Sequence, residues 1–183
     1  NWSKRFIQWL RELELPNQSA RKTLDHLLEI VEKIRLQKLK VLKDIKALLK
    51  KERYSPNARC LMSAPGVGPI LAATLLTEIV DIKRFPNFEQ FNSFIGFYPS
   101  QFSSGEKIHQ GTMIGRQNRR VRYMIIEAAW VAVRTDPAMT LFYDELKSKV
   151  GARRAIVKIA RKLLSRIRHV WINQQEYAYG LLK

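Results

Sequence analysis

The amino-acid sequence predicts an all-α fold in which a long N-terminal coiled-coil helix precedes a compact helical bundle. Apolar residues recur at the helical spacing of three and four along nearly every segment. No segment shows the sustained alternation of apolar and polar residues that is typical of β-strands. The 183 residues, 46% of them hydrophobic, are enough for one domain with a core and an appendage. We therefore expect three parts, residues 1–16, 17–53 and 54–183.

Residues 1–16 are predicted to form a short amphipathic helix and a linker. Trp2, Phe6 and Trp9 give this helix an aromatic face, and Pro16 ends it, because a proline interrupts helical hydrogen bonding. The first residue is Asn1 rather than Met, so we expect the chain to be a fragment of a longer protein.

Residues 17–53 are predicted to form a coiled-coil helix. Seven of eight a and d positions over about four heptads are apolar, and Lys38 occupies the eighth. These seven residues are Leu24, Leu27, Val31, Ile34, Val41, Ile45 and Leu48. A single helix that packs on its own core would also explain the stripe. The length and the period of 3.5 favour self-association into a homodimer or a higher homo-oligomer.

Residues 54–183 begin with a predicted helix-hairpin-helix at about residues 56–80. Gly66 and Gly68 lie between two helical patterns, and Pro69 begins the second helix. Glycines at such a turn let backbone amides approach a phosphate at the helix N-terminus. An ordinary helical turn that contacts no ligand explains the same residues.

The segment 96–115 is predicted to be an irregular loop or a small hairpin that exposes serine hydroxyls. Ser103, Ser104 and Gly105 lie in it, and a cluster of arginines follows at the start of a helix. A hydroxyl beside guanidinium groups can attack or bind a phosphodiester. A solvated turn before a basic helix is the alternative.

Basic helices are predicted over residues 116–175, and the whole chain carries a formal charge of +17 with a pI near 10.3. Such an excess of positive charge indicates a polyanionic partner, with nucleic acid favoured over a membrane surface. No apolar run approaches the roughly 18 residues that a spanning helix needs, so we do not expect an integral membrane protein. With nucleic acid favoured, we expect no membrane partner. The predicted nucleic-acid-binding residues are Gly66, Gly68, Lys107, Arg116, Asn118, Arg119, Arg120, Arg122, Arg154, Lys158, Arg161 and Lys162. A basic row on a helix is often no more than a solvated face.

The sequence shows no constellation of residues that would make a self-sufficient enzyme. His26, His109 and His169 lack metal-ligand spacing, and no glycine-rich nucleotide loop is present. Glu78 and Asp81 lie one turn apart and could hold Mg²⁺, but they resemble ordinary residues of a helix end. We therefore expect no metal and no cofactor to be bound by this chain. Its single cysteine is consistent with a reducing, cytoplasmic setting.

Several short motifs occur along the chain in the same order as in a known protein family. They are Pro65-Gly66-Val67-Gly68, Ala73-Thr74-Leu75-Leu76-Thr77-Glu78-Ile79, Asp81, Arg84-Phe85, Gly96, Pro99-Ser100, Ser103-Ser104-Gly105, Gly111, Asn118-Arg119, Arg122 and Glu127-Ala128-Ala129-Trp130. Together they resemble the C-terminal transposase domain of the DEDD transposases of insertion sequences, which are related to Piv-type DNA invertases. The resemblance spans about residues 54–177, and the preceding helical coil resembles the family's layout.

The resemblance implies a bacterial or archaeal recombinase that works on DNA at the nucleoid and is built from two parts. A RuvC-like domain upstream of the coil would carry four acids that bind Mg²⁺, and this chain would supply a serine that attacks DNA covalently. The family's serine matches Ser104. Because Ser103 is adjacent, a shift of the match by one residue would make Ser103 the nucleophile instead. Because some members are guided by a bridge RNA, a structured guide RNA is a second expected partner. The alternative function is a non-catalytic helix-hairpin-helix module that binds nucleic acid and is dimerised by the coil.

Overall fold

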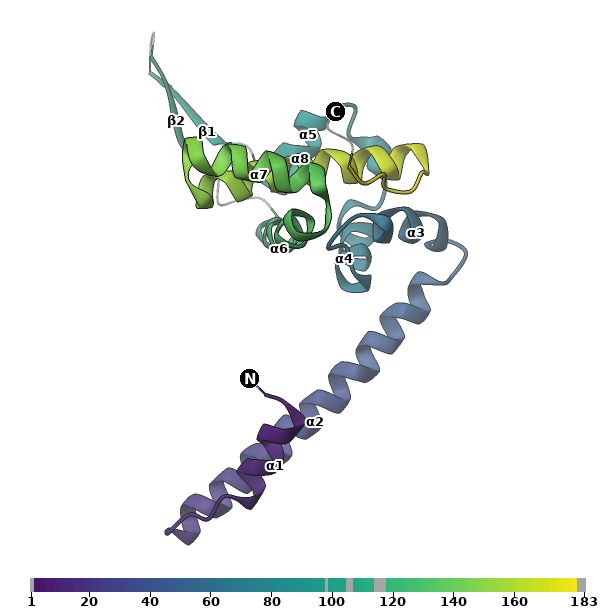
Figure 1. The fold of residues 1–183 in the computed structure, drawn as a ribbon. Helices are drawn as coiled ribbons and strands as arrows, with labels where there is room; N and C mark the ends of the chain where they lie inside the picture. Colours follow the sequence, from purple (N-terminus) through teal and green to yellow (C-terminus); the bar gives the residue numbers. More distant parts are fainter. Residues whose placement is uncertain (1, 98, 105–106, 114–117, 181–183) are drawn as a thin grey trace. The chain divides into compact units, whose positions relative to one another are not determined.

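The computed structural model describes residues 2–97, 99–104, 107–113 and 118–180 of the chain (Figure 1). The chain divides into two compact units, Asn1–Asp44 and Ile45–Lys183. The long helix α2, Gln18–Leu49, continues from the first unit into the first residues of the second.

The first unit is a helical hairpin in which α1, Lys4–Glu12, lies along α2 (Figure 1). The hydroxyl of Ser3 begins α1 by accepting a hydrogen bond from the Phe6 amide at 3.2 Å. Arg21 of α2 donates to the carbonyls of Leu10 and Leu13 at 3.0 and 2.9 Å. These two hydrogen bonds satisfy carbonyls at the C-terminal end of α1 and fix the return of the chain.

The second unit contains six further α-helices and one short 3₁₀-helix in its described residues. The elements are α3 (Ser55–Ser63), α4 (Pro69–Ile79), η1 (Ile82–Arg84), α5 (Phe88–Ile95), α6 (Arg119–Thr135), α7 (Pro137–Val150) and α8 (Ala152–Asn173). Prolines at the first turns of α3, α4 and α7 suit helix starts, where a missing amide costs no internal hydrogen bond.

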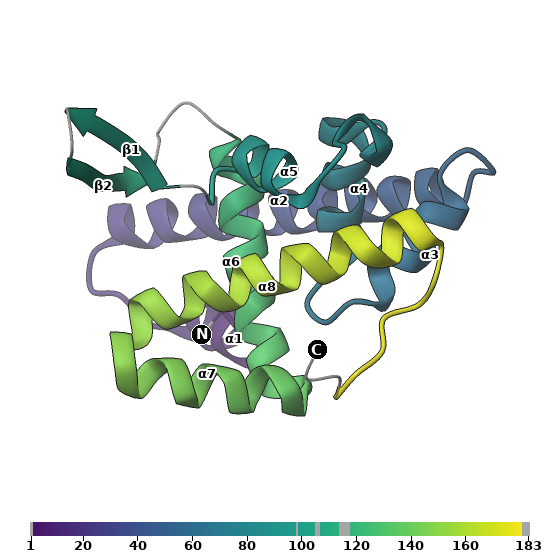
Figure 2. The same cartoon turned by 90° about the horizontal axis from the view of Figure 1, so that it is seen from above.

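The core of the second unit forms around α8, which crosses α6 and runs beside α7 (Figure 2). Its apolar face is completely buried at Ile159, Leu163, Leu164 and Ile167. α3 and α5 also contact α8, so this one helix joins the α3–α4 pair to the α6–α7 pair. After α8 the chain turns at Gln174, whose side-chain amide donates to Asn57 of α3 at 2.7 Å.

A small antiparallel hairpin lies between α5 and α6. Its strands are β1, Pro99–Ser104, and β2, Lys107–Met113, with Phe102 opposite His109 and Ser104 opposite Lys107. The expected all-α fold, with a long N-terminal helix before a helical bundle, is confirmed. Of the two conformations expected for the segment 96–115, its described residues 99–104 and 107–113 adopt the small hairpin.

Candidate functional site

Ser104, the predicted nucleophile, is the last residue of β1. It pairs with Lys107, the first residue of β2, so both lie at the end of the ladder far from the helical bundle. For these two residues the backbone alone belongs to the described structure, and the predicted phosphate ligand Arg116 lies outside the described residues.

The predicted helix-hairpin-helix corresponds to α3 and α4, which contact one another across the turn at residues 64–68. Gly66 has φ +77°, and a side chain there would come within 2.6 Å of backbone atoms of Ala128 in α6. Packing and a left-handed backbone therefore both require glycine at position 66. A side chain at Gly68 would have no heavy atom within 4 Å, and no side chain caps the first amides of α4. Of the two glycines, Gly68 is the one that leaves room for a phosphate beside the helix N-terminus.

The first turn of α6 carries four of the predicted ligands for nucleic acid, and they differ in their surroundings. Arg119 and Arg120 are exposed, and Arg119 donates to the Tyr123 hydroxyl at 3.1 Å. Arg122 is only 8% exposed and donates to the carbonyl of Gly96 at 3.0 Å. The Asn118 amide donates to Glu78 at 2.9 Å, while its carbonyl oxygen caps α6 by accepting from Val121. Asn118 and Arg122 thus connect parts of the fold, and Arg119 and Arg120 face solvent.

The predicted basic row on α8 is divided in the same way. Arg154 and Lys158 are exposed. Arg161 pairs with both carboxylate oxygens of Glu89 at 2.8 Å. Lys162 lies 4.2 Å from the centre of the Phe142 ring, and partial burial, with repulsion from Arg166, lowers the pKa of its ammonium group. The exposed N-terminal part of the row is therefore better placed for a polyanion than the paired part.

The predicted self-association stripe is partly exposed. Leu27, Ile34 and Val41 are 54%, 57% and 55% exposed. Within the first unit, α1 covers a different face of α2, where Leu28 is buried and Arg11 pairs with Glu32 at 2.5 Å. Leu24, Val31, Ile45 and Leu48 are half-buried, and Ile45 packs against the core of the second unit.

Glu78 and Asp81, the pair that could hold Mg²⁺, both accept hydrogen bonds within the protein. Glu78 accepts from Asn118, and Asp81 caps η1 by accepting from the Lys83 amide at 2.8 Å. Among the described residues, no group of three or more His, Cys, Asp or Glu side chains could hold a metal ion. In the same part of the chain, no helix is long and apolar enough to cross a lipid bilayer.

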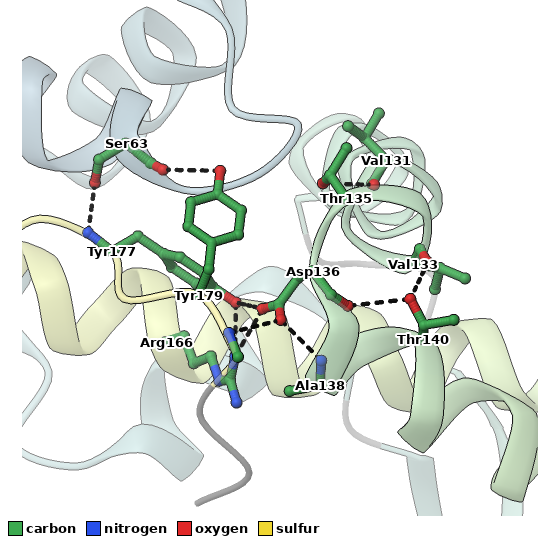
Figure 3. Close-up of polar contacts among 11 residues, drawn as sticks. Ser63, Val131, Val133, Thr135, Asp136, Ala138, Thr140, Arg166, Tyr177 and Tyr179 are labelled. Carbon is green, nitrogen blue, oxygen red and sulfur yellow. Dashed lines mark hydrogen bonds and ion pairs between the residues drawn. The ribbon is translucent and has the colours of Figure 1, made fainter.

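A buried polar cluster around Asp136 was not apparent in the sequence (Figure 3). The Asp136 carboxylate is fully buried and accepts from the Tyr177 hydroxyl at 2.5 Å and from Arg166 at 3.0 Å. It also accepts from the amides of Ala138 and Gly180 at 3.0 Å, which caps α7 and holds the segment after α8. In the sequence, an aspartate before a helical proline indicates only the cap of the following helix. The other donors to Asp136 lie 30 or more residues away along the chain, so no local pattern predicts them.

The cluster shifts the ionisation of both acidic groups within it. Burial by itself raises the pKa of Asp136, but the hydrogen bonds from Tyr177, Gly180 and Ala138 and the charge of Arg166 outweigh it and hold this pKa below its usual value. Burial, together with donation to Asp136, raises the pKa of the Tyr177 hydroxyl well above its usual value. The cluster is therefore built for an ionised aspartate and a neutral tyrosine.

Known proteins are similar to the part of the chain that contains the α3–α4 turn, the hairpin and α6. A sequence profile described as the transposase IS116/IS110/IS902 family matches residues 58–144, from α3 through the hairpin and into α7. An uncharacterized 43.6 kDa protein of insertion element IS110 from Streptomyces coelicolor is 32% identical over 66% of this chain and 29% of its own length. The transposase of insertion sequence element IS1111A from Coxiella burnetii is 31% identical over 66% of this chain and 34% of its own length.

The chain thus spans about a third of the length of these relatives. The matched residues include most of α3, all of α4, the strand that ends at Ser104 and the first turn of α6. Residues 58–144 of the chain therefore belong to the IS116/IS110/IS902 family of insertion-sequence transposases.

Proposed function

We propose that this chain is the DNA-binding, catalytic half of an insertion-sequence transposase, in which Ser104 attacks a DNA phosphodiester. The observation that carries the proposal is the match to the transposase family over residues 58–144, which includes the hairpin with Ser104. The Ser104 oxygen would lose its proton and form a bond to phosphorus, and the bond from phosphorus to a deoxyribose oxygen would break. The departing oxygen would take up a proton, leaving the DNA joined to the protein through a phosphoserine link.

A second domain is part of the proposal, because a serine hydroxyl needs activation. We assign this role to a RuvC-like domain outside the chain, consistent with relatives about three times as long as the part matched. Mg²⁺ bound by that domain would neutralise charge that develops on the phosphate. Exposed arginines of this chain, Arg119 and Arg120, would contact the phosphate backbone. We propose DNA as the partner, with a structured guide RNA as a second nucleic acid.

The test is to trap the covalent intermediate. Full-length protein is incubated with Mg²⁺, its insertion-sequence ends and end-labelled target DNA, and products are separated on a denaturing gel. We expect a labelled protein–DNA adduct whose modified peptide, after nuclease and protease digestion, contains Ser104. An adduct mapped to a peptide outside residues 99–113, or recombination without any adduct, contradicts the proposal.

A second candidate function, a purely binding helix-hairpin-helix module, is supported by the open space at Gly68. We expect Gly68→Glu to weaken DNA binding about tenfold, because it sets a negative charge where a phosphate would approach the N-terminus of α4. Fluorescence anisotropy at several salt concentrations measures the affinity, which should fall steeply with salt.

The matched control is Gly68→Gln, which adds nearly the same bulk without the charge. Since a Cβ atom at this position meets no atom within 4 Å, both variants should keep the thermal stability of the parent. Equal affinity for Gly68→Glu and Gly68→Gln would show that this turn does not contact DNA.

We also propose that the stripe on α2 mediates self-association. Leu27 and Ile34 are more than half exposed, and pairing with a second copy would remove them from water. Replacing both by aspartate should convert a dimer or higher oligomer into a monomer, as measured by light scattering. Leu36, which is 68% exposed but lies off the a and d positions, provides the control as Leu36→Asp. A parent protein that is monomeric at high concentration would contradict the proposal.

A further inference from the structure

Both ends of the segment that carries the hairpin are held by the same turn of α6. The described chain enters this segment at Phe97 and leaves it at Asn118, with β1 and β2 between them. Asn118 caps α6, and Arg122 lies one turn further on, where its amide donates to the Asn118 carbonyl at 3.0 Å. The side chains of these two residues reach different helices.

The entry side is fixed by Arg122. Its guanidinium donates to the carbonyl of Gly96 at 3.0 Å, in a buried position. Gly96 ends α5 with φ +95°, and the amides of Gly96 and Phe97 both donate to the Asn92 carbonyl, at 3.0 and 3.1 Å. Because Phe97 is only 4% exposed, the residue that leads toward β1 is also anchored in the core.

The exit side is fixed by Asn118, which has two separate functions. Its side-chain oxygen accepts from the Val121 amide at 3.1 Å and begins α6. Its side-chain amide donates to Glu78 in the last turn of α4 at 2.9 Å. A hydrogen bond to an ionised acceptor is stronger than a neutral one, so this contact ties the end of the hairpin segment to α4.

We infer that Glu78, Asn118 and Arg122 form a clamp that positions the hairpin, and with it Ser104, for attack on DNA. The inference rests on the proposed function, and it makes Asn118 and Arg122 positioning residues rather than ligands of nucleic acid. Ser104 lies at the far end of a two-stranded hairpin, so a small rotation at its base becomes a larger displacement at Ser104. Displacing reacting groups by about 1 Å can slow a reaction by a factor of 10².

The two functions of Asn118 allow a test by exchange of donor and acceptor. Asn118→Asp keeps the oxygen that caps α6 but loses the amide that donates to Glu78, and it places two carboxylates together. We expect this variant to form the Ser104 adduct about tenfold more slowly at saturating DNA. The double variant Asn118→Asp with Glu78→Gln reverses the hydrogen bond and keeps the net charge of the parent. Adduct formation in the double variant should return to within about twofold of the parent.

A loss of rate in the double variant equal to that in Asn118→Asp would overturn the inference, and so would an unchanged rate in Asn118→Asp. Arg122 is tested by Arg122→Lys, which retains a donor for the Gly96 carbonyl, against Arg122→Met, which does not. The slower rate should belong to Arg122→Met, and equal rates would remove Arg122 from the clamp.

The position of the hairpin can also be measured without DNA or chemistry. Spin labels are placed at positions 110 in β2 and 141 in α7, where Leu141 is 63% exposed, in a Cys60→Ala background. We expect one narrow distance distribution in the parent, a broader or shifted one in Asn118→Asp, and recovery in the double variant. An unchanged distribution in Asn118→Asp would overturn the clamp. The two proposals can fail separately. If Asn118→Asp shifts the distance distribution but Ser104→Ala still forms the adduct, the proposed function is contradicted and the clamp is supported.

Discussion

Ser104→Ala is expected to abolish the covalent protein–DNA adduct of the full-length transposase while changing its DNA affinity by less than about twofold. Removal of the proposed nucleophile would eliminate the bond-forming step, whereas the surfaces proposed to hold the phosphate backbone would remain. Adduct yield on a denaturing gel and affinity by anisotropy give the two measurements. Both are made with Mg²⁺ and saturating DNA.

Ser103→Ala and Ser100→Ala are the matched controls, since they remove hydroxyls from the same strand. Each should retain adduct formation, although Ser103 neighbours the proposed nucleophile and its variant is expected to be somewhat slower. If Ser104→Ala instead forms the adduct at the parental rate, the attacking group is another nucleophile of the protein, such as Ser103 or Ser100. If both Ser103→Ala and Ser104→Ala lose the adduct, mapping the modified peptide of the parent protein identifies the serine that carries the phosphate.

Much of the helical architecture follows from local features of the sequence. The heptad pattern predicted a helix within residues 17–53, and α2 spans Gln18–Leu49. Asparagine is a residue type that favours helix starts, and the Asn87 side chain begins α5 by accepting from the Gln90 amide at 2.9 Å. Such features depend on residues within one or two turns, so the sequence alone is sufficient to predict them.

The partners of charged side chains could not be predicted in the same way. Arg161 and Glu89 are 72 residues apart, and Asn118 and Glu78 are 40 apart. The helical pattern on α8 predicts that Arg161 lies on the face opposite the buried residues of that helix. It does not predict that α5 supplies a carboxylate beside Arg161. Arg122 was expected to bind nucleic acid because it belongs to a basic cluster, yet its position on α6 buries it against the end of α5.

The return of α1 along α2 is another feature that the sequence did not predict. The apolar spacing of residues 1–16 shows an amphipathic helix, and its direction is set by Arg21, which reaches the carbonyls of Leu10 and Leu13. Arg21 also pairs with Asp25 one turn later on α2, which orients the guanidinium. A contact of this kind depends on the geometry of the turn at Pro16, and no periodic pattern encodes it.

Asp136→Ala is expected to destabilise the second unit by about 3 kcal/mol or more, the largest effect on stability that we predict. Removing one partner of a buried ion pair is strongly destabilising, and here Arg166 and the Tyr177 hydroxyl both lose the Asp136 carboxylate as an acceptor. The Gly180 amide and the cap of α7 lose theirs as well. The melting temperature should fall by roughly 6–12 °C, as measured by calorimetry or circular dichroism.

Tyr177→Phe provides the matched variant, because it removes the hydroxyl that donates to Asp136 and accepts from Arg166 at 2.7 Å, and it keeps the ring that packs on Tyr179. We expect a loss of about 1–2 kcal/mol, smaller than for Asp136→Ala. In Asp136→Ala the further change Tyr177→Phe should cost less than in the parent, because the hydroxyl has already lost its acceptor and keeps only the hydrogen bond from Arg166. Additive losses would show that the two side chains contribute independently, contrary to the cluster that the structure describes.

The cluster also predicts how stability depends on pH. Because the pKa of Asp136 is lower in the folded protein than in the unfolded chain, its contribution is present above the usual carboxyl value of 3.8 and is lost as pH falls through the folded pKa. The pKa of Tyr177 is raised, so its contribution is present below the usual phenol value of 10.0 and is lost as pH rises beyond it. The free energy of unfolding should therefore differ most between the parent and Asp136→Ala at neutral pH, and the difference should shrink in acid. A difference that stays constant between neutral pH and pH 3 would mean that the charge of Asp136 does not contribute, and that only the packing of its side chain does.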